Sequence, residues 1–178
     1  DYCSLAEAVL QDCASHGVIY AEVFLSPTSF GYDAAKWADY LVAVDEAAGR
    51  VEAAAGVIAR FIPVAIRHHD PVQSLLLAEA VTSLPRGRMV GFGMAGDGRM
   101  HAPRDYAGAF TLAAEAGLRL TAHAGEFGGP ESVRAVLDDL KVERVGHGVR
   151  AAEDADLMRR LAVEGQVHSV VRLHRNVH

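Results

Sequence analysis

The strongest constraint on the fold is an alternation of short β-branched, apolar runs with longer segments of helical periodicity. Strands are predicted at residues 17–24, 56–66, 88–92, 118–123, 143–146 and 166–171, and helices at 34–55, 71–84, 104–116, 131–140 and 154–163. Parallel strands cannot be joined by a hairpin and need a longer crossover, usually a right-handed helical one. The alternation therefore predicts an α/β fold with a parallel sheet.

Two architectures contain such a sheet: a doubly wound open sheet and a (β/α)8 barrel of the TIM type. About six of eight β/α units are present, so a barrel would be incomplete. A closed barrel typically needs about 250 residues, whereas this chain has 178. The sequence shows no internal repeat and no linker rich in Gly, Pro or Ser. We expect residues 1–178 to form one domain or part of one, and the lack of an initial Met suggests a fragment or a processed product.

Composition argues against several classes of function. The chain has 17 Lys and Arg against 23 Asp and Glu, a formal net charge of −6, whereas a general nucleic-acid binder needs a basic surface. No apolar stretch approaches the ~18 residues of a membrane span, and the first residues do not resemble a signal peptide. Two cysteines, Cys3 and Cys13, are too few for a disulfide framework, which favours the cytoplasm.

Polar residues gather just after the predicted strands, where a barrel places its active site. His123 ends one strand, where a neutral imidazole can bind Zn²⁺; otherwise it is a surface or hydrogen-bonded core histidine. Glu126 follows Gly125, at which the chain can turn sharply. In a dry pocket a carboxyl group has a raised pKa and can donate a proton near neutral pH. The alternative is that Glu126 only complements the N-terminus of the next helix.

His147 lies between Gly146 and Gly148 and could orient or deprotonate a metal-bound water, or simply occupy a tight turn. Gly96 follows another strand, and its N–H could reach a ligand that a side chain would block, unless it belongs to an ordinary turn. Because His123, Glu126 and His147 follow consecutive predicted strands, the functional interpretation is favoured for the three together. The P-loop, the dinucleotide-binding motif, the G-x-S-x-G motif and the cytidine-deaminase zinc motif do not occur.

The segment 121–126, which contains His-Ala-Gly-Glu, and the segment 143–149, which contains Gly-His-Gly, together resemble the adenosine deaminase family. Segments 20–27, 66–68 and 91–97 are similar to other parts of that family, and the likeness runs from about residue 5 to residue 165. The resemblance implies an incomplete (β/α)8 barrel that needs Zn²⁺. It also implies the hydrolysis of adenosine, a small purine nucleoside, to inosine and ammonia.

The resemblance also implies a role for each candidate residue. His123 would be a zinc ligand, and Glu126 would donate a proton to purine N1. His147 would assist the zinc-bound water as a base and electrostatic stabiliser. Gly96 would offer its backbone N–H to the purine ring. These roles agree with the chemistry inferred from the residues themselves, because a metal, a protonated carboxyl group and an imidazole form a coherent hydrolytic set.

Two motifs of the family have no counterpart in the chain. These are a His-x-His pair on the first strand and an Asp-Asp pair on the eighth, which supply further zinc ligands and a contact to purine N7. We therefore expect the parent protein to be the enzyme, and this polypeptide to bind zinc poorly and have little deaminase activity. Two alternatives stay open: a deaminase of adenine or another 6-aminopurine, and a non-catalytic fragment that keeps the fold.

Overall fold

The computed structural model describes residues 2–26 and 33–164, and in that part of the chain five strands form one parallel sheet. The strands lie side by side in chain order, from β1 to β5. The elements are α1 (Tyr2–Ser15), β1 (Tyr20–Leu25), α2 (Ala34–Ala55), β2 (Ile58–Ile66), α3 (Pro71–Thr82), β3 (Gly91–Ala95), η1 (Pro103–Tyr106), α4 (Ala107–Glu115), β4 (Arg119–Ala124), α5 (Pro130–Leu140), β5 (Arg144–His147), η2 (Val149–Glu153) and α6 (Ala155–Glu164).

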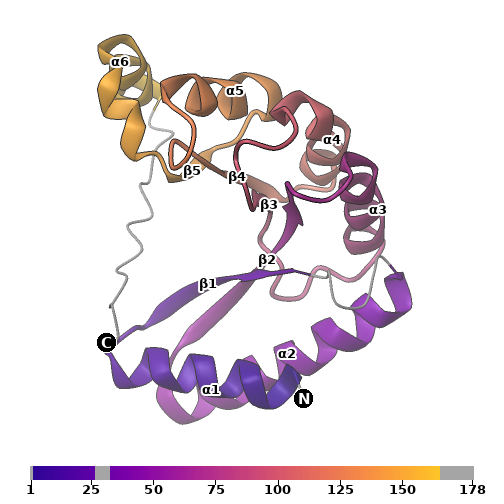
Figure 1. Ribbon diagram of the computed structural model, residues 1–178. Coiled ribbons are helices and arrows are strands. Elements are labelled where there is room, and N and C mark those ends of the chain that lie inside the picture. The colour runs from indigo at the N-terminus through magenta and orange to yellow at the C-terminus, as the bar shows by residue number, and fades with distance from the viewer. Residues whose placement is uncertain (1, 27–32, 165–178) are drawn as a thin grey trace.

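The sheet is curved, and its helices lie on the outer, convex side (Figure 1). A doubly wound sheet would instead reverse its strand order at one point and carry helices on both faces. The sequential order therefore selects the incomplete barrel from the two architectures that the sequence left open. The strand predicted at 166–171 lies outside the described residues. No helix in the described ranges is both long and apolar enough to cross a membrane.

The hydrophobic core lies between the convex face of the sheet and the helices. Every second residue of the central strands points into it, including Phe92 and Met94 on β3 and Ala122 on β4, all fully buried. The rings of Phe92 and Phe110, a residue of α4, meet edge to face with centroids 5.3 Å apart. This packing fixes the strands from outside, so that the concave face is left to other residues.

Local signals set the helix ends. Asp33 precedes α2, and its carboxylate accepts hydrogen bonds from the backbone N–H groups of Ala35 and Lys36. Gly56 ends the helix in the left-handed conformation, with φ of 75°. Because these are the standard signals for the start and stop of a helix, the predicted range 34–55 is the range observed.

The third strand differs from its prediction, which placed it at 88–92. The pairing with β4 begins at Gly91, and β3 runs to Ala95. The observed strand contains Gly91 and Gly93, and the fold needs glycine at both. A Cβ atom at Gly91 would lie 2.7 Å from the carbonyl oxygen of Arg119, and one at Gly93 would lie 2.9 Å from Cγ1 of Val64. The observed bounds follow from the pairing with β4, and close packing explains the two glycines within the strand.

Candidate active site

The structure brings the four predicted site residues to the carboxyl ends of β3, β4 and β5. Gly96 directly follows β3, His123 lies in β4, Glu126 is in the loop after β4, and His147 is the last residue of β5. Nε2 of His147 is 3.3 Å from Oε2 of Glu126. The imidazole rings of His123 and His147 are perpendicular, with centroids 4.8 Å apart. Two imidazoles and a carboxylate therefore share one location, as expected for residues that end neighbouring parallel strands.

The turn after His123 depends on Gly125, which has φ of 68°. A Cβ atom there would lie 2.8 Å from Cγ2 of Val133, so a side chain has no room. The Gly125 N–H donates a hydrogen bond to Oγ of Ser132 at 2.9 Å, and that hydroxyl donates to the Gly129 carbonyl oxygen at 2.7 Å. Ser132 thus holds both ends of the loop that carries Glu126. The Glu126 side chain is 40% exposed, so the described residues do not give it the dry pocket that the sequence suggested.

The two histidines are held in different ways. Gly146 lies beside the His123 ring so closely that a Cβ atom at this position would overlap the ring carbon Cδ2. His147 itself has φ of 64°, a left-handed conformation in which a residue other than glycine costs about 1–3 kcal/mol. Strain of this kind persists only where the surroundings impose it and is common at functional sites. It marks His147 as a functional candidate independently of its sequence motif.

Gly96 also needs to be glycine. Its φ is 96°, and a Cβ atom would lie 3.1 Å from both the backbone nitrogen of Arg67 and Nδ1 of His68. Together with His123 and Glu126 it lines a small pocket whose volume is about 10 Å³. That is room for about one water molecule. The described strands therefore supply one wall of a site rather than an enclosed cavity.

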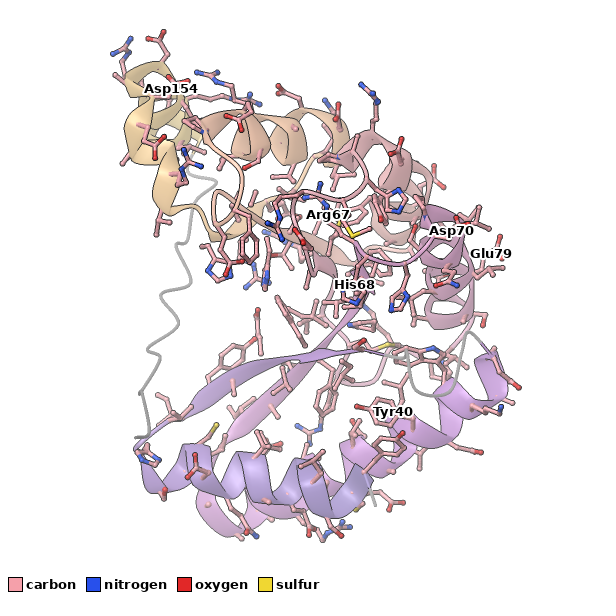
Figure 2. All side chains as sticks on the ribbon, in the orientation of Figure 1. Tyr40, Arg67, His68, Asp70, Glu79 and Asp154 are labelled. Carbon is pink, nitrogen blue, oxygen red and sulfur yellow. The ribbon has the colours of Figure 1, made fainter. Side chains whose placement is uncertain are left out.

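Arg67 is a supporting residue to which the sequence assigned no role. Its side chain is buried, and burial lowers the pKa of the guanidinium. Nε donates to the carbonyl oxygen of Met100 at 3.2 Å, and Nη2 to that of His101 at 2.5 Å. Figure 2 shows Arg67 between the strand ends and the helices, with His68 below it. Arg67 therefore fixes the loop that follows Gly96, and a charged residue directly after a long apolar strand was the signal available for it.

The concave face of the sheet carries an ion pair and an aromatic contact that the sequence did not predict. Arg144 on β5 donates through Nη1 to Oε2 of Glu22 on β1, and the Tyr20 hydroxyl donates to Oε1 of the same carboxylate at 2.9 Å. The rings of Phe24 and His123 have centroids 5.4 Å apart and are tilted by 39°. The available signal was the alternation of Glu22 and Phe24 with residues of the outer face, because successive side chains of a strand point to opposite faces.

A metal site is not complete within the described residues. They contain no group of three or more His, Cys, Asp or Glu side chains that could hold a metal ion. A catalytic zinc has about three protein ligands. His123 can supply only one of them. The described side chains by themselves therefore do not fit a zinc centre.

Comparison with known proteins identifies the family. Residues 1–177 match the family model described as adenosine deaminase. The chain belongs to the adenosine deaminase family. The resemblance noted in the sequence is thereby confirmed.

Curated relatives in this family carry a more specific name. The adenine deaminase of Chelativorans sp. (strain BNC1) is 44% identical over 170 residues, which is 96% of this chain and 52% of the relative. The adenine deaminase of Sinorhizobium medicae (strain WSM419) is 42% identical over 173 residues, with the same two coverages. The chain thus spans about half the length of the curated relatives it matches.

Solved structures agree with the incomplete barrel. An amidohydrolase from Burkholderia ambifaria with bound Zn has a TM-score of 0.85 and 29% identity, over 93% of this chain and 46% of that one. The adenine deaminase from Arthrobacter aurescens has a TM-score of 0.82 and 29% identity, over 92% of this chain and 50% of that one. The expected fold, part of a TIM-type barrel, is confirmed.

Proposed function

We propose that residues 1–178 belong to a single domain of a 6-aminopurine deaminase. Adenine is the proposed substrate of this enzyme. The observation that carries the proposal is the Glu126–His147 pair, 3.3 Å apart and next to His123 at the strand ends. Adenosine was the substrate expected from the family resemblance, with adenine as the alternative. The names of the relatives favour adenine, because adenine deaminases are 44% and 42% identical to this chain.

The proposed reaction consumes adenine and water and releases hypoxanthine and ammonia. Glu126 donates a proton to ring nitrogen N1, which makes C6 more electrophilic, and His147 accepts a proton from the attacking water. The short distance between the two side chains places the acid and the base within reach of one substrate ring. Gly96 orients the ring through its backbone N–H, at a position where its own lack of a side chain leaves the approach open.

We propose zinc as the metal of the complete site, with His123 as one ligand and the others from outside the described residues. The amidohydrolase from Burkholderia ambifaria, which holds Zn and shares the fold, supports this assignment. The 178-residue chain alone should then bind zinc weakly and turn over little substrate. We further propose a role in cytoplasmic purine metabolism, which fits the two cysteines, because neither is in a disulfide.

The test compares three proteins at the full length that the gene encodes: wild type, Glu126→Gln and Glu115→Gln. Glu115 is an exposed residue at the end of α4, so it controls for the loss of one carboxylate. Ammonia release from adenine and adenosine is measured for each. We expect wild type to prefer adenine and Glu126→Gln to lose about 10²–10⁴ in rate, the usual size of a general-acid contribution. No turnover of either purine by wild type, or full activity of Glu126→Gln, would refute the proposal.

A further inference from the structure

An aromatic ring at the mouth of the half-barrel has no part in the proposed reaction. Phe24 lies near the end of β1, in register with Ile62 of β2, so both side chains belong to the concave face. Its ring lies against His123 of β4, with centroids 5.4 Å apart, although β2 and β3 separate the two strands. The Phe24 side chain therefore extends over the concave surface towards the candidate active site.

β3 presents glycine to the concave side, and side chains of the neighbouring strands close over it. A Cβ atom at Gly93 would lie 2.9 Å from Cγ1 of Val64 and 3.2 Å from Cγ2 of Thr121. The Phe24 ring is only partly covered by its surroundings. It is 38% exposed, so a substantial part of its flat face is available at the level of the site.

The ion pair lies one layer further down. Glu22 precedes Phe24 by two residues on the same face of β1, and its carboxylate is occupied by Arg144 and Tyr20. These groups satisfy one another and close the interior beneath the aromatic ring. A ligand that enters from the strand ends therefore meets the Phe24 ring before it meets Glu22, Arg144 or Tyr20.

Within residues 33–164, three arginines at the strand ends are engaged in hydrogen bonds. Arg67 donates to two carbonyl oxygens. Arg99 makes two hydrogen bonds to Asp97, at 2.7 and 2.9 Å, and Arg150 makes two to Glu153, at 2.8 and 3.0 Å. A phosphate group, with a charge near −2, is normally recognised by such cations. Binding one at Arg99 or Arg150 would require breaking an existing ion pair.

We propose that Phe24 is a specificity-determining residue that stacks against the flat face of an uncharged aromatic base, and that the site disfavours phosphorylated nucleotides. The proposal deepens the proposed function, on which it rests for the identity of the base. An aromatic side chain offers a large flat surface at a low cost in conformational entropy, and a base has a complementary π-face. Among the described residues, the pairs Arg99–Asp97 and Arg150–Glu153 account for the discrimination, because an incoming phosphate would have to compete with a carboxylate for either guanidinium.

The experiment uses Phe24→Leu, which removes the ring but stays apolar, and Phe24→Tyr, which keeps a ring. Tyr20→Leu is the matched control, since it removes a ring from the same face of the same strand below the ion pair. Dissociation constants for adenine and AMP are measured by equilibrium dialysis, and kcat and KM for adenine in the full-length protein. We expect Phe24→Leu to raise both Kd and KM for adenine about tenfold, with little change in kcat, because stacking acts on ground-state binding.

Phe24→Tyr should bind adenine within about twofold of wild type, Tyr20→Leu should match wild type, and AMP should bind wild type more weakly than adenine. The inference is overturned if Phe24→Leu binds adenine as wild type does, if wild type binds no adenine, or if AMP binds more tightly. Ring-dependent binding of adenine without turnover would contradict the proposed reaction and leave the stacking role standing. Turnover of adenine that does not depend on Phe24 would contradict the stacking role and leave the proposed reaction standing.

Discussion

The two faces of the sheet are made from alternate residues of the same strands, yet their chemistry is opposite. The convex face is apolar, and Phe92, for example, is fully buried. The concave face carries Glu22, Phe24, His123 and Arg144, with glycines between them. The convex face thus stabilises the barrel, whereas the concave face combines buried apolar residues such as Ile62 with charged groups and a partly exposed aromatic ring. We expect substitutions on the two faces to separate stability from function.

The largest effect on stability should come from Phe92→Ala, because a buried Phe replaced by Ala leaves a cavity and typically costs about 3–5 kcal/mol. Phe24→Ala is the matched change on the concave face. It should cost clearly less, since Phe24 is already 38% exposed. Urea unfolding of the two variants measures the difference. Equal losses would show that the concave face contributes as much to stability as the convex one.

Gly146→Ala should come next, because the new methyl group overlaps the His123 ring. Overpacking of this kind costs about 1–3 kcal/mol, and the displaced imidazole should also reduce activity. Gly108→Ala in α4 is the control, since no atom lies within 4 Å of its added Cβ and alanine favours a helix. Thermal unfolding should show a lower Tm for Gly146→Ala and a slightly higher Tm for Gly108→Ala. A tolerated Gly146→Ala would contradict the close approach.

His147→Gly should separate stability from activity most sharply. Glycine adopts the φ of 64° without strain, so stability should be unchanged or rise by up to about 1 kcal/mol, while activity is lost. Lys141 is the matched position, with φ of 54° at the end of α5 and no place in the site. Lys141→Gly should gain similar stability and keep activity. If His147→Gly is strongly destabilised, its backbone strain is not released by glycine.

The smallest effect should appear in acid. Hydrogen bonds from the Arg99 side chain and backbone hold the pKa of Asp97 well below its ordinary range. A carboxyl group whose folded pKa is lowered adds stability above its unfolded pKa, and this is lost as the pH falls through the folded value. Asp97→Asn should therefore have a lower Tm than wild type near neutral pH, and the gap should narrow in strong acid. A gap that is independent of pH would mean that the ion pair contributes nothing measurable.

Prediction from the sequence succeeded where the signal was local. The 22 residues of α2 lie between an Asp cap and a left-handed glycine, and both signals are readable in the sequence. His123, Glu126 and His147 came together because parallel strands end at one edge. The prediction for β3, residues 88–92, differs from the observed Gly91–Ala95, because the strand's bounds depend on its pairing with β4 and its two glycines on contacts with Arg119 and Val64 of neighbouring strands.

The concave contacts could not be predicted, because they depend on how strongly the sheet curves. Strands in a flat sheet are about 4.8 Å apart, so β1 and β5 would be separated by roughly 19 Å. Glu22 and Arg144, which are 122 positions apart in the chain, nevertheless form a hydrogen-bonded pair. The same curvature brings the ring of Phe24 to His123.

The sequence by itself determined the alternation of strands and helices, the family, and the catalytic candidates of the strand ends. These depend on periodicity, caps and short motifs, which act over a few residues. Only the tertiary structure decided the left-handed backbone of His147, the role of the β3 glycines and the partners of Phe24 and Glu22. The physical reason is that curvature arises from the packing of the whole convex face, and no single segment of the sequence specifies it.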